Sequence, residues 1–387
     1  MQPAVDTSTK TGPPSLALVH DYLLVLRGAE RTFAAMTDCW PANPVYTLLF
    51  DSGGTFGRFD ERDIHTSYLQ RLGVRQRGFR ALLPLFPRAV EHLPVQDYEV
   101  VISSSSAFAH GIRPGPGAVH VCYCHSPFRY VWHEREQALR EMPAVARPLL
   151  DLLLRRIRRW DLEASRRVTH YIANAKITRE RIARNWGRDA TIIHPPVDVD
   201  RFSIGTPEDY LLVVTEHVRH KMVDVALAAA RRAGRPVKVV GSGPDSDRLR
   251  ALYGDYAEFV GRVSDAELTQ LYTRALALVV PNVEDFGIAA VEAQAAGRPV
   301  VAMNEGGTTE TVIDGETGVL VPPGDPDALA EALAETDFGR FDPQRIRNHA
   351  QQFSIAAFQR RFTAELERLT SVSAPTSGYI TQPGPQK

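Results

Sequence analysis

The sequence predicts an α/β protein with two domains, each built around a doubly wound parallel sheet. Short apolar runs alternate with helical patterns along most of the chain, and the paired prolines Pro195 and Pro196 divide these runs into two series. Alternating strands and helices form parallel sheets with helices on both faces, so two series imply two sheets. A length of 387 residues exceeds that of a usual single domain and agrees with this division.

The expected strands are the short apolar runs themselves. In the first series they cover residues 16–19, 45–49, 100–103, 118–123, 170–173 and 191–194. In the second series they cover residues 210–214, 236–240, 257–260, 275–280, 299–302 and 318–321. Ligands bind beyond the carboxyl ends of strands in such sheets, so we expect a cleft between two domains that face these ends toward one another.

The domain boundaries follow from the prolines and from the ends of the periodic pattern. We predict an N-terminal domain over residues 15–194, a linker over 195–200 and a C-terminal domain over 201–342, because paired prolines continue neither a helix nor a strand. Residues 1–14 and 371–387 lack apolar periodicity, and we expect both to be flexible tails.

Composition excludes several classes of protein. A hydrophobic content of 44%, a charged content of 24% and a formal net charge of −1 give no general attraction to nucleic acid. No apolar run approaches the roughly 20 residues that span a bilayer, and the N-terminus lacks a signal pattern. The three cysteines suit a reducing compartment, and we expect buried packing for Cys122 and Cys124. We therefore expect a cytoplasmic protein.

The most informative segment is residues 281–293, which contains two glutamates around a glycine. The apolar run before it predicts a buried strand, and a helix is expected to begin near Phe286. Free N–H groups at a helix start attract phosphate, and Gly287 lets the backbone approach a ligand closely. Glu284 in the loop can accept hydrogen bonds from sugar hydroxyls, and Glu292 on the helix can accept them from a ribose diol. The segment therefore suits a phosphorylated sugar.

Together with other segments, this pattern resembles the retaining glycosyltransferases of family 4, which have the GT-B fold. The matching segments, between about residues 15 and 370, are 16–22, 27–30, 122–127, 187–198, 241–244, 259–263, 284–292, 304–307 and 314–318. The order and spacing of these segments make the resemblance specific. It implies an acceptor-binding N-terminal domain, a nucleotide-sugar-binding C-terminal domain, and a final helix over residues 343–370 that crosses back to the N-terminal domain.

The resemblance also implies roles for individual residues. The residues expected to bind the donor are Gly28, Ala29, Arg219, Lys221, Gly243, Val260, Glu284, Asp285, Phe286, Gly287, Ile288 and Glu292. The residues expected to bind the acceptor are Asp21, Ser106, His125 and Arg129, and those expected to act in catalysis are His125, Lys221 and Glu284. No metal and no other cofactor is expected, because Asp198 and Asp200, which form an Asp-x-Asp pair, lie in the linker.

Three positions depart from the family pattern. Glu216 stands where relatives supply an arginine to the donor diphosphate, so Arg219 or another cation has to compensate. Ser106 stands where relatives commonly have a histidine, and Ala175 replaces a serine whose hydroxyl could cap a helix. Loss of a cation near the leaving diphosphate could cost several kcal/mol, so low activity is one outcome that the sequence leaves open.

The resemblance is strongest to bacterial mannosyltransferases of polysaccharide assembly. It implies transfer of a hexose, with mannose from GDP-mannose as the leading expectation, onto a hydroxyl of a glycan or lipid-linked acceptor. A basic run at residues 155–160 follows an apolar run at 148–154, which is typical either of a helix at the inner face of a membrane or of a core-packed helix with a solvated edge.

Two other functions stay open. A nucleotide-sugar epimerase can have the same fold and would convert the donor without an acceptor. A non-catalytic nucleotide-sugar-binding protein is suggested by Glu216 and Ser106. A dinucleotide-dependent oxidoreductase is disfavoured, because residues 27–30 read Arg-Gly-Ala-Glu and lack the Gly-x-Gly-x-x-Gly fingerprint.

Overall fold

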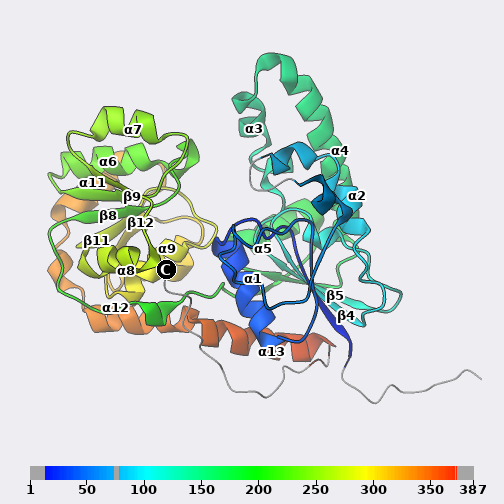
Figure 1. Cartoon of the computed structure of the whole chain (residues 1–387). Helices are drawn as coiled ribbons and strands as arrows, with labels where there is room; N and C mark the ends of the chain where they lie inside the picture. The colour runs from blue at the N-terminus through cyan, green and yellow to red at the C-terminus, as the bar shows by residue number, and fades with distance from the viewer. Residues whose placement is uncertain (1–13, 74–77, 371, 373–387) are drawn as a thin grey trace, which may run out of the picture. The chain divides into compact units, whose positions relative to one another are not determined.

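The structure is a computed structural model that describes residues 14–73, 78–370 and 372. The predicted tails lie outside these residues, apart from residues 14 and 372. Within the described part the chain forms two compact units, one from residues up to 122 with 142–170 and 361 onward, the other from 123–141 with 171–360. It contains two parallel sheets with helices packed on them (Figure 1). The fold class predicted from the sequence is thereby confirmed, while the predicted domain boundaries stay a prediction.

The first sheet has seven strands in the order β3-β2-β1-β4-β5-β6-β7. These strands are β1 (Leu16–His20), β2 (Val45–Thr47), β3 (Ile64–Thr66), β4 (Val100–Ser105), β5 (Val119–Cys124), β6 (His170–Ala173) and β7 (Thr191–Ile192). Every residue of β1 and β4 is buried, as expected for central strands of a parallel sheet. Because β1 pairs with β2 on one side and β4 on the other, the direction of winding reverses between β1 and β4.

The second sheet has six strands in the order β10-β9-β8-β11-β12-β13. These strands are β8 (Leu211–Val214), β9 (Val237–Val240), β10 (Glu258–Gly261), β11 (Ala277–Val280), β12 (Val300–Met303) and β13 (Gly318–Val321). Here the winding reverses between β8 and β11. Loops after two strands that flank such a reversal diverge and leave a crevice at the carboxyl edge of the sheet, where α/β proteins bind ligands.

Alternating residues of the second sheet enter two separate cores. Leu211 and Val213 pack toward α6 (Val223–Arg232) and α11 (Pro326–Glu335), while Leu212 packs with residues of α9 (Ile288–Ala295). Both faces are therefore apolar, which explains why these strands read as continuous apolar runs.

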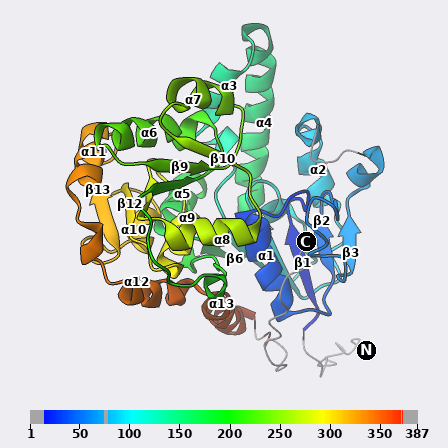
Figure 2. The same ribbon diagram turned by 60° about the vertical axis from the view of Figure 1, so that its left-hand side comes forward.

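The remaining helices connect the strands. They are α1 (Gly28–Cys39), α2 (Phe86–Glu91), α3 (Arg135–Glu141), α4 (Arg147–Ser165), α5 (Lys176–Trp186), α7 (Ser246–Tyr253), α8 (Asp265–Arg274) and α10 (Thr308–Thr311). The longest is α4, with 19 residues, seen as the extended helix of Figure 2. None of the helices within the described ranges is long and apolar enough to span a membrane.

The C-terminal segment differs from the single helix predicted over residues 343–370. It forms two helices, α12 (Pro343–Ala350) and α13 (Ile355–Thr370), separated by a 3-10 turn, η9 (Gln351–Phe353). The carbonyl of Phe353 accepts a hydrogen bond from the Val197 N–H at 2.8 Å. The helix is interrupted where its backbone pairs with the linker, a tertiary contact that helical periodicity does not report.

Candidate functional site

Lys221 and Glu284 lie in the loops that follow β8 and β11, the two strands that flank the reversal in the second sheet. Lys221 Nζ donates to Glu284 Oε1 at 2.7 Å and to Oε2 at 2.8 Å, and Asn282 Nδ2 donates to Oε1 at 3.0 Å. Both charged side chains are 23% exposed. The loops at this reversal therefore present a cation and a carboxylate that a polar ligand can reach, which is a suitable pair for a phosphorylated, hydroxyl-rich molecule.

The backbone beside Lys221 is in an unusual conformation. Met222, which joins the short turn η7 (Arg219–Lys221) to α6, has a φ of +50°. A side chain other than glycine in the left-handed region costs of order 1–3 kcal/mol and persists only where the surroundings impose it. Such strain is frequent at functional sites, and here it fixes the direction in which the chain leaves Lys221.

The turn after Glu284 ends at Gly287, whose φ of +91° favours glycine. Gly287 is the N-cap of α9, and the first turn of this helix presents N–H groups without intrahelical partners. Phe286 beside it is 3% exposed and packs against the rings of His194 and Phe353 at 5.4 and 5.5 Å between centroids. The turn is thus anchored by a buried ring and can present its amides to an anion.

Gly306 and Gly307 explain how this turn keeps its position. A Cβ on Gly306 would lie 2.5 Å from the Glu284 carbonyl oxygen, and one on Gly307 would lie 2.2 Å from the Phe286 Cα. The Gly307 N–H also donates to the Glu284 carbonyl at 2.8 Å. The glycine pair therefore supports the Glu284 backbone from behind, a packing role that the sequence alone did not distinguish from phosphate binding.

Glu292 lies on α9, and both of its carboxylate oxygens have partners. Oε1 accepts from Arg201 Nη2 at 3.1 Å and Oε2 accepts from Tyr272 Oη at 3.0 Å. Arg201 also contacts Asp265 at 3.1 Å. Neither Arg201 nor Tyr272 was identified from the sequence, since an arginine directly after the linker and a helical tyrosine follow no motif.

Asp285 contacts two arginines of the same compact unit. Its carboxylate forms ion pairs with Arg181 and, at 3.5 Å, with Arg129, which also contacts Glu134 at 3.4 Å. Burial would raise the pKa of Asp285, but the two guanidinium groups hold it below its ordinary value. The predicted donor contact of Asp285 and the predicted acceptor contact of Arg129 would therefore both require ligands to compete with this ion pair.

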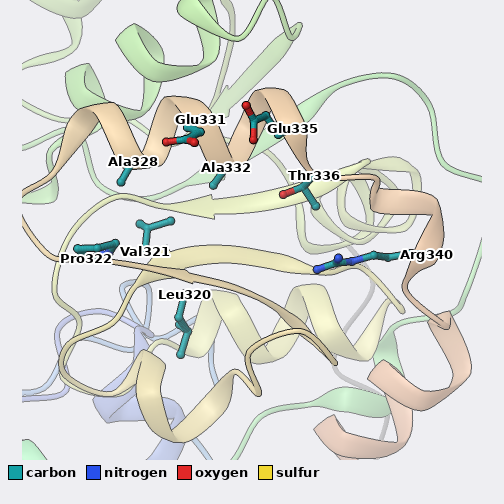
Figure 3. Close-up of a pocket in the computed structure, with 9 residues that line it drawn as sticks. All are labelled: Leu320, Val321, Pro322, Ala328, Glu331, Ala332, Glu335, Thr336 and Arg340. Atoms are coloured by element: carbon teal, nitrogen blue, oxygen red, sulfur yellow. The ribbon is translucent and has the colours of Figure 1, made fainter.

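A separate surface cavity of about 340 Å³ lies at the edge strand β13 and the helix α11 (Figure 3). Its lining consists of Leu320, Val321, Pro322, Ala328, Glu331, Ala332, Glu335, Thr336 and Arg340. None of the residues predicted to bind a ligand lines it. Over residues 14–73, 78–370 and 372, no group of three or more histidine, cysteine or acidic side chains is arranged to hold a metal ion.

Comparison with known proteins finds two family models that match this chain. The model of "Glycosyltransferase Family 4" matches residues 26–201, and that of "Glycosyl transferases group 1" matches residues 197–352. Glycosyltransferase models thus match two successive parts of the chain.

Curated relatives match this chain over part of their length. It is 36% identical to D-inositol 3-phosphate glycosyltransferase 2 of Catenulispora acidiphila, over 48% of this chain and 53% of that protein. It is 39% identical to the alpha-1,3/1,6-mannosyltransferase ALG2 of Rhizomucor pusillus, over 29% of this chain and 26% of that one. The chain thus spans about half the length of the first relative and about a quarter of the second.

Solved structures match over almost the whole chain. HepE from Anabaena, in complex with UDP, has a TM-score of 0.69 at 16% identity and covers 92% of this chain and 100% of that one. The sucrose-phosphate synthase of Thermosynechococcus elongatus has a TM-score of 0.69 at 19% identity and covers 93% and 100%. At such identities the likeness concerns the fold, and it confirms that this chain has the GT-B fold.

Three residues with predicted ligand roles follow strands of the first sheet, Gly28 and Ala29 after β1 and His125 after β5. Gly28 and Ala29 open α1 with the Arg27 N–H bound to Glu30 Oε2 at 2.9 Å, so Ala29 has an ordinary helical backbone. His125 is half-buried, with its ring 5.1 Å from that of Tyr123. These positions are compatible with the predicted roles of Gly28, Ala29 and His125, which stay predictions.

Asp21 does not have the geometry expected of an acceptor-binding residue. It is 2% exposed, and its carboxylate accepts hydrogen bonds from the backbone N–H groups of residues 106–109 at 2.5 to 3.0 Å. A carboxylate has about four acceptor sites, and these four donors occupy them. Asp21 therefore fixes the loop that contains Ser106, and contact of its side chain with an acceptor, which would have to compete with these amides, stays a prediction.

The structure accounts for the departure at Ala175 but not for the one at Glu216. Glu216 is exposed, and Arg219, expected to compensate for it, contacts Asp245 at 3.2 Å. At Ala175, Glu310 replaces the missing cap, because its Oε1 accepts the Lys176 N–H at 2.7 Å.

The predicted base-pocket residues are placed by backbone packing. A Cβ on Gly243 would lie 2.3 Å from the His217 carbonyl oxygen, so glycine is required there by the neighbouring loop. Val260 lies in β10 and packs partly against the core. The glycine is thus explained without a ligand, and contact of either residue with a nucleotide base stays a prediction.

Proposed function

We propose that this chain is a retaining glycosyltransferase that moves a hexose from a nucleoside diphosphate sugar onto a hydroxyl of a glycan or lipid-linked acceptor. The observation that supports this most strongly is the Lys221–Glu284 pair in the crevice of the second sheet, directly before the start of α9. A cation, a carboxylate and free helix N–H groups recognise a diphosphate and sugar hydroxyls together.

In the proposed reaction the bond between the sugar C1 and the diphosphate oxygen breaks, and a bond from C1 to the acceptor oxygen forms on the same face. The acceptor proton passes to the leaving diphosphate. Lys221 and the N–H groups at the start of α9 stabilise the charge that develops on that group. Glu284 accepts hydrogen bonds from the sugar hydroxyls, and Glu292 accepts them from the ribose. No side-chain nucleophile and no metal is part of this proposal.

Lys221 and Glu284 bind one another directly, so a donor has to insert between them or share them. This exchange replaces one charge-assisted contact by two, from Lys221 to phosphate and from a sugar hydroxyl to Glu284. Both side chains are partly exposed, so the exchange requires no rearrangement of the core.

The donor is proposed to be GDP-mannose, with UDP-sugars as the competing class. The partial likeness to a mannosyltransferase supports mannose. The structurally similar HepE was solved with UDP-glucose, which supports a uridine donor. A thermal-shift panel of GDP-, UDP- and ADP-sugars separates these, because a ligand at about 100 times its Kd stabilises the fold by roughly 2.7 kcal/mol. No shift with any nucleotide sugar would contradict the proposed function.

A non-catalytic nucleotide-sugar-binding protein is the second candidate, favoured by Glu216 and by the contact of Arg219 with Asp245. Incubation with donor and a panel of acceptors distinguishes the two. Donor binding without product, together with transfer gained by Glu216→Arg, would support the non-catalytic reading. Isomerised sugar in the absence of acceptor would instead support an epimerase.

We further propose that the N-terminal half of α4 and the residues before it contact an anionic membrane surface. Val145, Leu149 and Leu152 are 90%, 74% and 66% exposed, whereas the C-terminal half of α4 is packed through Leu154 and Ile157. Four exposed arginines follow these apolar side chains, at positions 155, 156, 158 and 159. Exposed apolar groups beside arginines match the chemistry of an acidic lipid surface.

Vesicle sedimentation tests this contact. We expect binding to vesicles that contain phosphatidylglycerol, weaker binding at high salt and little binding to neutral vesicles. The double variant Leu149→Gln with Leu152→Gln should lose this binding, while Leu252→Gln, at a leucine exposed in the other unit, should retain it. Equal binding by all three proteins would contradict a membrane role for α4.

A further inference from the structure

Glu292 is held by a network that reaches from the linker to α8. Arg201, at the end of the 3-10 turn η6 (Val199–Arg201), donates to Oε1, and Tyr272 of α8 donates to Oε2. All these residues belong to one compact unit. Both oxygens thus receive a donor from the protein, which fixes the orientation of the carboxylate. The Glu292 side chain is 17% exposed, so a ligand can still reach it.

Tyr272 is a fixed donor in this network. Its side chain is fully buried, with its ring 5.6 Å from that of Phe202 in an edge-to-face arrangement. Burial, the charge of Glu292 and the hydrogen bond to Glu292 together hold the pKa of Tyr272 well above its ordinary value. The phenol therefore keeps its proton and donates a hydrogen bond to the carboxylate.

Arg201 is held on three sides. Its guanidinium lies 4.7 Å from the centre of the Phe202 ring, contacts Asp265 Oδ2 at 3.1 Å and contacts Glu292 Oε1 at 3.1 Å. Phe202 is 2% exposed, so the linker is anchored where it presents Arg201 to α9. The positive charge of Arg201 offsets the negative charge of Glu292. This lowers the repulsion between the carboxylate and an anionic nucleotide.

We propose that Arg201 and Tyr272 are positioning residues that orient the Glu292 carboxylate to accept hydrogen bonds from the two ribose hydroxyls of the donor. This inference rests on the proposed function, because it needs a nucleotide in the crevice. It extends that function by making Arg201, at the end of η6, part of the recognition of ribose. Neither side chain touches the reacting atoms, and both act through Glu292.

Discrimination between ribose and deoxyribose tests the inference. Calorimetry measures the Kd of nucleotides for the unmodified protein and its variants. The nucleotides are GDP and UDP, each with its 2′-deoxy and 3′-deoxy forms. We expect the unmodified protein to bind the better ribonucleotide about tenfold more tightly than its deoxy forms, as loss of a hydrogen bond to a charged group implies. In Glu292→Gln, Arg201→Met and Tyr272→Phe this ratio should fall to about threefold or less.

Two variants control for general effects on folding. Tyr256→Phe removes another tyrosine hydroxyl of the same unit, one that donates to the Ala230 carbonyl at 2.7 Å. Arg274→Met removes another arginine ion pair of that unit, with Glu208 at 3.2 Å. Both controls should keep the ribose preference. Arg201→Lys should keep part of it, because a lysine retains the charge but loses the planar fork.

The possible failures are distinguishable. If the unmodified protein binds no nucleotide of any base, the proposed function fails and the inference fails with it. If Glu292→Gln loses the ribose preference but Arg201→Met and Tyr272→Phe keep it, the donor site stands and the positioning role is wrong. If ribose preference persists in Glu292→Gln, the assignment of Glu292 to the ribose is wrong.

Discussion

Lys221 Nζ lies 2.7 and 2.8 Å from the two carboxylate oxygens of Glu284, joining the loops that follow β8 and β11. The two residues are 63 positions apart in sequence and meet because the winding of the second sheet reverses between these strands. Each is partly exposed, so their attraction is screened by water and contributes little to stability. The pair is better explained by ligand binding than by folding.

Replacement of Lys221 should separate these two roles. In Lys221→Met we expect the free energy of unfolding to change by less than about 1 kcal/mol, because the ion pair is partly exposed. The affinity for a nucleoside diphosphate sugar should fall about tenfold or more, because a charged hydrogen bond to phosphate is lost. Urea unfolding and calorimetry measure the two effects. Lys238→Met, which breaks an ion pair with Glu258 at 3.2 Å, is the control and should leave affinity unchanged.

Asp21 should be a stability residue. In Asp21→Ala four backbone N–H groups of residues 106–109 lose their acceptor, and we expect a loss of about 3–5 kcal/mol in the free energy of unfolding. Chemical denaturation measures it, with Asp327→Ala, at an exposed aspartate of α11, as the control. A loss below about 1 kcal/mol would show that water replaces the carboxylate and that the loop is not fixed by Asp21.

His120 should make stability depend on pH. Burial, with the charges of His110 and Arg167 adding to it, lowers the pKa of His120 to about 3 from an ordinary 6.5. As pH falls below 6.5 the unfolded chain binds a proton that the folded protein does not, so stability falls until about pH 3. At pH 4.5 this one group should account for a loss of about 3 kcal/mol relative to pH 7.5.

Urea unfolding of His120→Gln at these two pH values checks this prediction. The variant should be less stable at pH 7.5, because the Ser103 hydroxyl loses a partner at 2.8 Å, but it should lose less stability on acidification. His65→Gln, at an exposed histidine, should follow the unmodified protein. Parallel pH profiles of all three proteins would contradict the role of His120.

Replacement of Gly307 should lower both the stability of the protein and its affinity for nucleotide sugars. An added methyl group would lie 2.2 Å from the Phe286 Cα, so Gly307→Ala must displace the turn that contains Glu284. We expect a loss of about 1–3 kcal/mol in stability and weaker binding of nucleotide sugars. Gly53→Ala, whose methyl group would lie 3.6 Å from the nearest atom, is the control. Unchanged binding by a folded Gly307→Ala protein would argue against a donor contact at this turn.

The sheets could be predicted because their strands are buried on both faces. Twelve apolar runs correspond to strands of the structure, and the exception is β3 (Ile64–Thr66), which the sequence analysis missed. This strand has three residues, lies at the edge of its sheet and is only partly buried. A short edge strand with a central histidine gives neither an apolar run nor an alternating pattern.

Side-chain partners in the site were less predictable than its position. Glu284 and Lys221 were identified because both follow strands and match family motifs, and the structure brings them together. Asp21 follows a strand in the same way, yet its oxygens are bound by amides from a loop 85 to 88 residues further along the chain. Arg201 and Tyr272 reach Glu292 only through tertiary packing. Sequence position indicates which residues reach the edge of a sheet, but not which backbone groups meet them there.

The most direct test of the central claim is the activity of the Glu284→Ala variant. The substrate is the sugar nucleotide that stabilises the unmodified protein best, and the measured quantity is the rate at which nucleoside diphosphate is released from it. If Glu284 holds the transferred sugar, kcat/KM should fall about 100-fold to 1,000-fold, while the thermal unfolding midpoint stays close to that of the unmodified protein. Glu208→Ala, at an exposed glutamate of the same unit, should keep full activity. A folded Glu284→Ala protein with unchanged kcat/KM would contradict the account.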